Sequence, residues 1–170
     1  MPPRLSTFSK ATNPCTLDVL LSTVPAMRQM PRREIKLLKR KHYSLCLEQL
    51  PVALDDDEKV ETLTCALSSS RGRGVLALTD RRLVLITLRT GTCDWALSEI
   101  DSVRGRGRGR GRAAYFMSPA AIYLDTPTGT IVIALGDGPV VVTGDGPVWG
   151  PMFTEATRRA HARQPLALAA

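Results

Sequence analysis

The sequence has few aromatic residues, two histidines and no paired cysteine motif. Phe, Trp and Tyr make up 5% of its 170 residues, which leaves little material for a platform on which nucleic-acid bases could stack. No two cysteines form a C-x-x-C pair, and with so few histidines no zinc-binding pattern arises. We therefore expect free, mostly buried thiols, with no metal site and no cofactor. The cysteines are Cys15, Cys46, Cys65 and Cys93.

Several longer signatures are also missing. No apolar run approaches the ~20 residues of a membrane-spanning helix, and residues 16–24 are too short and too interrupted for a secretory signal. The sequence contains no phosphate-binding G-x-x-x-x-G-K-[ST], no H-E-x-x-H and no G-x-S-x-G. We expect a cytoplasmic protein, either free or peripheral at the membrane, that is not an enzyme and has no catalytic residues.

Positive charge is present but unevenly distributed. The formal net charge is +7 and the isoelectric point is about 9.7. Basic residues are in excess in residues 1–50 and 104–170, whereas residues 51–103 carry more acids than bases. This pattern indicates cationic segments attached to a less basic domain rather than a uniformly basic domain.

The strongest local signal is a β-hairpin in residues 71–88. Two apolar, β-rich runs, 75–79 and 82–87, flank a polar turn at Asp80 and Arg81. Gly74 leaves room for a bend or for close approach of another backbone. Asp80 is expected to bond the local amides of the turn rather than to act in catalysis.

The remaining pattern predicts a mainly β (α+β) fold. Alternation predicts strands at 59–67, 92–97, 113–117, 120–126 and 130–135, the last two joined by a turn at 127–129. Residues 140–142 read as an edge strand or an inserted loop. A helix is expected at 149–162. Its inward residues are Met152, Phe153, Ala156 and Ala160.

Helices are expected before the strands. One short helix follows Thr16 and ends by Pro25, and a second, basic one spans 32–49 until Pro51 stops it. The apolar side of this second helix is formed by Ile35, Leu38, His42, Leu45 and Cys46. We favour a helix packed on the domain with its charged face in solvent. The alternatives are contact with anionic lipid or an acidic partner, and docking on the chain's own acidic loop at 55–58.

Three motifs in residues 54–104 resemble the bacterial pleckstrin-homology-like (PH-like) domains. They are Asp57-Glu58-x-Val60, then Gly74-Val-Leu-Ala-Leu-Thr79-Asp80-Arg81-Arg82-Leu83, then Trp95-x-Leu97-x-x-Ile100-x-x-Val103. The resemblance implies a bent, partly open antiparallel barrel capped by a C-terminal helix. It also implies a noncatalytic binding or scaffolding module. Here the domain would span 54–163, with an N-terminal tail and basic helix at 1–53 and a flexible tail at 164–170.

The partner implied by this resemblance is a protein or an anionic membrane surface. In PH domains that bind phosphorylated head groups, basic residues of the first strand–strand loop make the contact. The equivalent loop here contains Arg71 and Arg73, with Arg82 placed near the following strand. Guanidinium groups suit phosphate oxygens. These three arginines are the predicted anion site.

The tract 104–112, RGRGRGRGR, departs from the family pattern and suggests an alternative function. In an extended chain its arginines lie on one face, ~6.6–7 Å apart, which is of the order of the phosphate spacing in a single strand. The alternative is therefore nonspecific nucleic-acid binding, although a flexible loop expansion explains the composition equally well. The arginines concerned are Arg104, Arg106, Arg108, Arg110 and Arg112.

Overall fold

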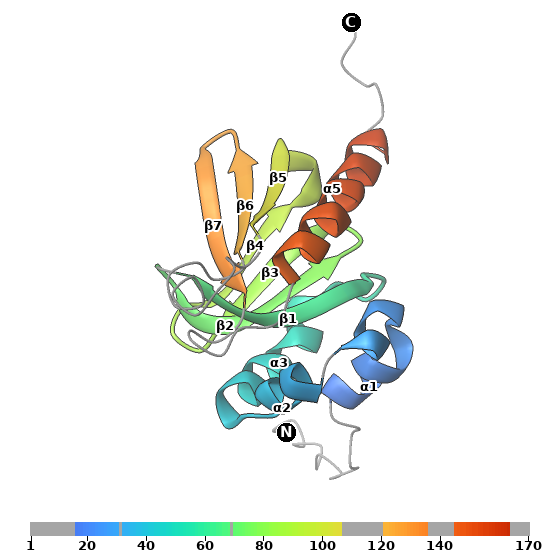
Figure 1. The fold of residues 1–170 in the computed structure, drawn as a ribbon, viewed down its shortest axis with the longest axis vertical. Coiled ribbons are helices and arrows are strands. Elements are labelled where there is room, and N and C mark those ends of the chain that lie inside the picture. The colour runs from blue at the N-terminus through green and yellow to red at the C-terminus, as the bar shows by residue number, and fades with distance from the viewer. Residues whose placement is uncertain (1–15, 31, 69, 107–120, 136–144, 164–170) are drawn as a thin grey trace, which may run out of the picture.

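A computed structural model of the chain describes residues 16–30, 32–68, 70–106, 121–135 and 145–163. Its centre is a curled, seven-stranded antiparallel sheet with the order β4-β3-β2-β1-β7-β6-β5 (Figure 1). The strands are β1 (Val60–Ser68), β2 (Gly72–Thr79), β3 (Arg82–Thr87), β4 (Gly91–Ala96), β5 (Ser102–Arg106), β6 (Ala121–Thr126) and β7 (Gly129–Leu135). The predicted α+β fold with a bent antiparallel sheet is confirmed. The strand predicted at 113–117 and the segment 140–142 lie outside the described residues.

The predicted hairpin is formed by β2 and β3, whose register places Leu78 opposite Leu83. Gly74 pairs with Thr87 in this register, and a Cβ atom at Gly74 would lie 2.0 Å from the carbonyl oxygen of Ile86. The close backbone approach that the glycine suggested is therefore present. Only glycine fits there without moving the neighbouring strand.

The C-terminal helix α5 (Asp145–Arg163) packs against β5 and against the short 3₁₀ helix η2 (Leu97–Glu99) that follows β4 (Figure 1). Ala156 is buried, and Met152 and Ala160 pack against the same core. The helix begins four residues before the predicted start at Trp149. Pro147 falls in its first turn, where a missing N–H leaves no intrahelical bond unmade.

The N-terminal extension contains three α-helices and a 3₁₀ helix. They are α1 (Thr16–Thr23), η1 (Pro25–Gln29), α2 (Arg32–Leu38) and α3 (Lys41–Ala53). The prediction of one helix over 32–49 was wrong, because Arg40 is extended and separates α2 from α3. Pro51 does not stop α3 either. It lies in the last turn, and the amide of Leu54 still donates to the carbonyl oxygen of Leu50 at 3.1 Å.

The break changes which side chains of the extension are buried. Each helix turns its own apolar side toward the protein, so the single face predicted from Ile35 to Cys46 does not exist. Leu45 is 37% exposed. The buried residues of α3 are Tyr43, Cys46, Leu47 and Leu50. The charged Lys36, Lys39 and Arg40 are exposed, as expected for helices packed on the domain.

The sheet has a hydrophobic core on each face. Leu76, Leu78, Leu83 and Leu85 point into the barrel, where they pack with residues of β6, β7 and α5. Val75, Ala77, Val84 and Ile86 alternate with them and pack against the N-terminal helices on the other face. Because both faces are covered, β2 and β3 are continuous apolar runs rather than alternating ones.

Two further observations concern the described residues. No helix among them is both long enough and apolar enough to cross a membrane. Cys46, Cys65 and Cys93 are not in disulfide bonds, and the first two are buried and the third half-buried. Cys15 lies outside the described residues.

Candidate functional site

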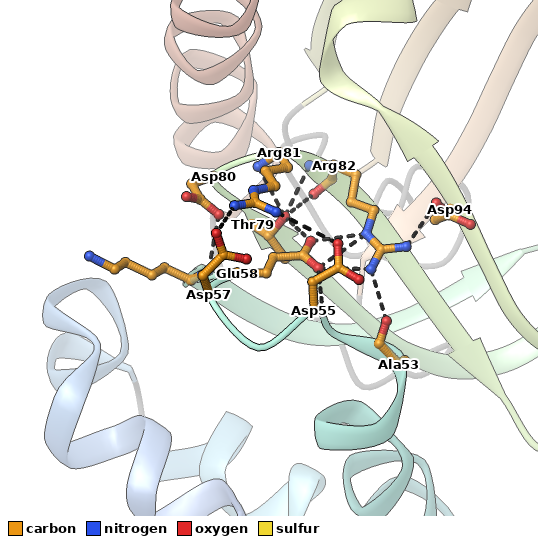
Figure 2. Close-up of polar contacts among 10 residues, drawn as sticks. Ala53, Asp55, Asp57, Glu58, Thr79, Asp80, Arg81, Arg82 and Asp94 are labelled. Carbon is orange, nitrogen blue, oxygen red and sulfur yellow. Dashed lines mark hydrogen bonds and ion pairs between the residues drawn. The ribbon is translucent and has the colours of Figure 1, made fainter.

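A buried ion network occupies the end of the sheet where β1 begins (Figure 2). Arg82 Nη2 donates to Glu58 Oε2 at 2.7 Å, and Arg82 Nε donates to Glu58 Oε1 at 3.0 Å. The other donors of Arg82 reach the carbonyl oxygen of Ala53 at 2.9 Å and Asp94 Oδ2 at 3.1 Å. The side chain of Glu58 is completely buried, and Arg82 is 21% exposed.

The network fixes the charge of Glu58. Burial alone would raise the pKa of this carboxyl group, but hydrogen bonds from Arg82, Thr79 and the amide of Asp55 outweigh burial and lower the pKa to about 2. The pKa of Arg82 is raised, first by its hydrogen bond to Glu58. Glu58 therefore stays ionised at neutral pH and holds Arg82 in one orientation.

The β2–β3 turn is organised by Thr79 rather than by Asp80. The hydroxyl of Thr79 accepts hydrogen bonds from the amides of Arg81 and Arg82 at 3.2 and 2.9 Å, and it donates to Glu58 Oε1 at 2.6 Å. Asp80 instead accepts from the amide of Lys59 at 3.0 Å. The predicted role of Asp80 within its own turn was wrong, because its carboxylate ties the turn to β1.

The acidic loop at 55–58 is partly neutralised by two arginines. Arg81 pairs with Asp57 and lies 3.7 Å from Asp55, while Glu58 pairs with Arg82 (Figure 2). The ion pairs of this loop thus come from the β2–β3 turn and not from the basic helices. Docking of the basic helix on the acidic loop is not what the structure shows.

The opposite end of the sheet gathers basic residues from three segments. The β1–β2 turn carries Arg71, β2 carries Arg73, and the β3–β4 turn carries Arg89, whose Cδ lies 4.0 Å from the Cβ position of Gly72. His42 Nε2, in the first turn of α3, lies 3.1 Å from the carbonyl oxygen of Arg73. The start of α3 therefore adjoins the two turns.

We call this surface the basic end, and its residues are Lys39, Arg40, Lys41, Arg71, Arg73 and Arg89. All are exposed except Arg71, which is half-buried. The segments that form it, 39–47, 70–74 and 87–93, contain no Asp or Glu. Burial raises the pKa of the Cys93 thiol on β4, and the positive charge of Arg71 opposes that shift, whereas the negative charge of Asp94 adds to it.

The structure brings together two of the three arginines predicted to bind anions. Arg71 and Arg73 share the basic end, whereas Arg82 lies at the other end of β2, and all three of its guanidinium nitrogens donate hydrogen bonds within the protein. Sequence reasoning missed Arg89 and the start of α3. Arg89 could have been found from the predicted meander, because the β1–β2 and β3–β4 turns of a meander lie at the same end of the sheet.

The other predicted residues are placed only in part. Arg104 and Arg106 lie two residues apart in β5. Arg108, Arg110 and Arg112 lie outside the described residues. Within the part of the chain that the structure describes, no three His, Cys, Asp or Glu side chains come close enough together to hold a metal ion.

Comparisons with known proteins give similarity in structure alone. No protein-family model and no curated protein matches the sequence. The chain is similar to the Vps36 N-terminal PH domain at 15% identity, with a TM-score of 0.46, over 62% of this chain and 83% of that one. It is also similar to the hSac2 domain of the human phosphoinositide phosphatase Sac2 at 14% identity, with a TM-score of 0.41, over 72% and 85% of the two chains.

Proposed function

We propose that the chain is a noncatalytic PH-like binding module whose basic end binds an anionic partner, either an acidic protein surface or an anionic membrane. The observation that carries the proposal is that basic residues from three segments meet at one end of the sheet. Arg71 and Arg73 are its centre. Like charges are gathered at a cost in mutual repulsion, which a bound anion relieves.

The charge distribution over the rest of the molecule supports an oriented encounter. The exposed carboxylates of Asp55 and Asp57 lie at the far end of β1 and β2, beside Asp80. The molecule is therefore positive at one end of the sheet and acidic at the other. A negatively charged surface attracts the basic end and repels the opposite one, and this steering weakens with salt.

The test compares two anionic probes at low and physiological salt. The probes are vesicles that contain phosphatidylserine, with phosphatidylcholine vesicles as reference, and soluble polyglutamate. Each Lys or Arg near an anionic bilayer contributes about 1 kcal/mol, so the double variant R71S/R73S should bind the vesicles about 30-fold more weakly. The double variant R81S/R158S removes the same charge elsewhere and should leave binding unchanged. Binding to neither probe, or equal losses in both variants, contradicts the proposal.

The second candidate function is nonspecific nucleic-acid binding through Arg104, Arg106, Arg108, Arg110 and Arg112. What favours it is that β5 is a terminal strand of the sheet and contains the first two of these arginines in alternation with glycine.

A further inference from the structure

A pocket of about 320 Å³ lies where the end of β4 meets the β6–β7 turn. Figure 1 places this turn at the end of the sheet away from the N-terminal helices. The volume is at the lower end of the roughly 300–1,000 Å³ typical of ligand sites, so the pocket suits one side chain or a small ligand. Its lining residues are Trp95, Glu99, Thr126, Pro127 and Thr128.

The lining comes from the described part of the chain. Thr126 pairs with Gly129 at the tip of the β6–β7 hairpin. The chain leaves the described barrel after Arg106 of β5 and after Leu135 of β7, and it re-enters at Ala121 of β6. These three residues are at the opposite ends of their strands, so the pocket is remote from them.

Two of the lining side chains are available to a ligand. Trp95 is half-buried, because one part of its indole packs against the barrel core and another part lines the pocket. Glu99 is exposed. Among the described residues, neither the carboxylate of Glu99 nor the indole N–H of Trp95 has a hydrogen-bond or ion-pair partner. The carboxylates of Glu58, Glu61 and Glu155, in contrast, are each paired with an arginine.

The charge around the pocket is negative. Asp101 and Asp125 lie beside it, and the amide of Asp101 donates to the carbonyl oxygen of Asp125 at 2.8 Å. The segments 90–103 and 121–135, which supply the whole lining, contain no Lys or Arg. The pocket therefore attracts a cation and disfavours an anion.

We infer that this pocket binds an arginine side chain of a partner protein. The planar guanidinium group stacks on the indole face of Trp95 and pairs with the carboxylate of Glu99. Guanidinium suits this combination better than an ammonium group does, because it is more weakly hydrated and its donors match a carboxylate. The site goes beyond the proposed function, which concerns an anionic partner of the basic end.

The composition of the lining favours an arginine within a chain over the free amino acid. Free arginine brings a carboxylate of its own, and the lining has no basic residue to receive it. In a peptide this carboxylate is replaced by an amide, whose carbonyl oxygen can accept a hydrogen bond from the indole N–H of Trp95.

The probe is the capped tripeptide acetyl-Gly-Arg-Gly-amide, titrated into the full chain and followed by NMR of the indole and backbone N–H groups. We expect saturable shifts of the Trp95 indole signal and of the amides at 97–99 and 126–129. The variant Trp149→Phe distinguishes the two indole signals of the chain.

Three related probes define the ligand chemistry. The citrulline peptide has the shape of the arginine peptide without its charge and should bind at least tenfold more weakly. The lysine peptide should bind several-fold more weakly, because an ammonium group is more strongly hydrated. Free arginine should also bind several-fold more weakly than the capped peptide.

Variants of the chain locate the site. Glu99→Gln should weaken binding of the arginine peptide about fivefold. Trp95→Phe, which keeps an aromatic ring against the core, should weaken it about threefold, and Trp95→Leu about tenfold. Glu48→Gln removes the same charge from an exposed position on α3 and should have no effect. R71S/R73S should bind the peptide normally, so failure here is distinguishable from failure of the proposed function.

Several results would overturn the inference. Absence of saturable binding, shifts confined to other parts of the chain, equal binding of the citrulline peptide, or equal effects of Glu99→Gln and Glu48→Gln would each remove the site. Tighter binding of the lysine peptide would overturn the choice of arginine. Equal binding of free arginine would overturn the assignment to a partner protein.

Discussion

The guanidinium group of Arg82 connects the side chain of Glu58 to the main chain of Ala53. Its Nη2 atom lies 2.7 Å from Glu58 Oε2 and 2.9 Å from the carbonyl oxygen of Ala53. Ala53 ends α3, Glu58 precedes β1, and Arg82 begins β3. One side chain thus holds the helical extension, the first strand and the central hairpin in a fixed arrangement.

This connection predicts a dependence of stability on pH. The folded-state pKa of Glu58 is about 2, below its ordinary value of 4.5. The carboxylate therefore stabilises the fold fully above pH 4.5, and the contribution is lost as the pH falls from there to about 2. At neutral pH it is worth about 3 kcal/mol. Glu58→Gln should lower the free energy of unfolding by about that amount at pH 7, and the difference should shrink toward pH 2.

Denaturant unfolding of both proteins at several pH values measures this effect. Asp56→Asn, which removes an exposed carboxylate from the same loop, serves as the control and should follow the wild type throughout. A constant difference between Glu58→Gln and the wild type from pH 7 to pH 2 would show that the ion pair does not titrate as described.

A second prediction contrasts two glycines. Gly74→Ala places a Cβ atom 2.0 Å from the carbonyl oxygen of Ile86, so β2 and β3 must separate, and we expect a loss of about 3 kcal/mol or more. Gly91 has a positive φ of 75° but open space around it. Gly91→Ala should cost about 1–2 kcal/mol through backbone strain alone. Thermal unfolding of the two variants shows which one loses more stability. A larger loss of stability for Gly91→Ala than for Gly74→Ala would contradict the close backbone approach at Gly74.

A third prediction concerns the domain boundary expected at residue 54. The outer faces of β2 and β3 are buried by the N-terminal helices, so deletion of residues 1–53 exposes Val75, Val84 and Ile86. We propose that residues 16–163 are one folding unit, and the truncated chain should aggregate or bind a hydrophobic dye. Recovery of a monomer with cooperative unfolding would support the boundary at 54 instead.

A fourth prediction tests the tract 104–112. If its five arginines contact phosphates, the log–log salt slope of single-stranded nucleic-acid binding is about −3.5, at ~0.7 per contact. Replacement of all five by serine should flatten this slope. The variant R71S/R73S should lower the slope by no more than about 1.4. Equal slopes for the wild type and the serine variant would mean that the arginines do not contact phosphates and that the tract is a loop expansion.

Much of the fold could be predicted because its signals are local. The β2–β3 hairpin, the β6–β7 hairpin and the C-terminal helix each follow from apolar runs and turn residues close together in the chain. The uninterrupted apolar run from Leu83 to Ile86 is also the pattern typical of a strand that is buried on both faces. The break between α2 and α3 had no such signal, because neither Gly nor Pro lies at Arg40 and the break serves packing on the curved sheet.

The sites could be predicted less well because they join distant residues. Glu58 and Arg82 lie 24 positions apart in the chain. The sequence therefore suggested that Arg82 was available to bind an anion, whereas in the structure it is paired with Glu58. Asp80 looked like a turn residue, although its partner is the amide of Lys59. Arg71 and Arg73 could be placed in one loop, but their proximity to Arg89 and α3 depends on how the sheet curls.

The two faces of the sheet also differ in when they can be completed during synthesis. Among the described residues, the core beneath the N-terminal helices is formed by residues between Leu17 and Ile86. The core inside the barrel runs from Ala66 to Ala156, so it must wait for α5. Because chains emerge from the ribosome N-terminus first, the helices and the first three strands can consolidate while the barrel is still open. In the nascent protein, the face of β2 and β3 that packs on the N-terminal helices is then buried before α5 can cover the face inside the barrel.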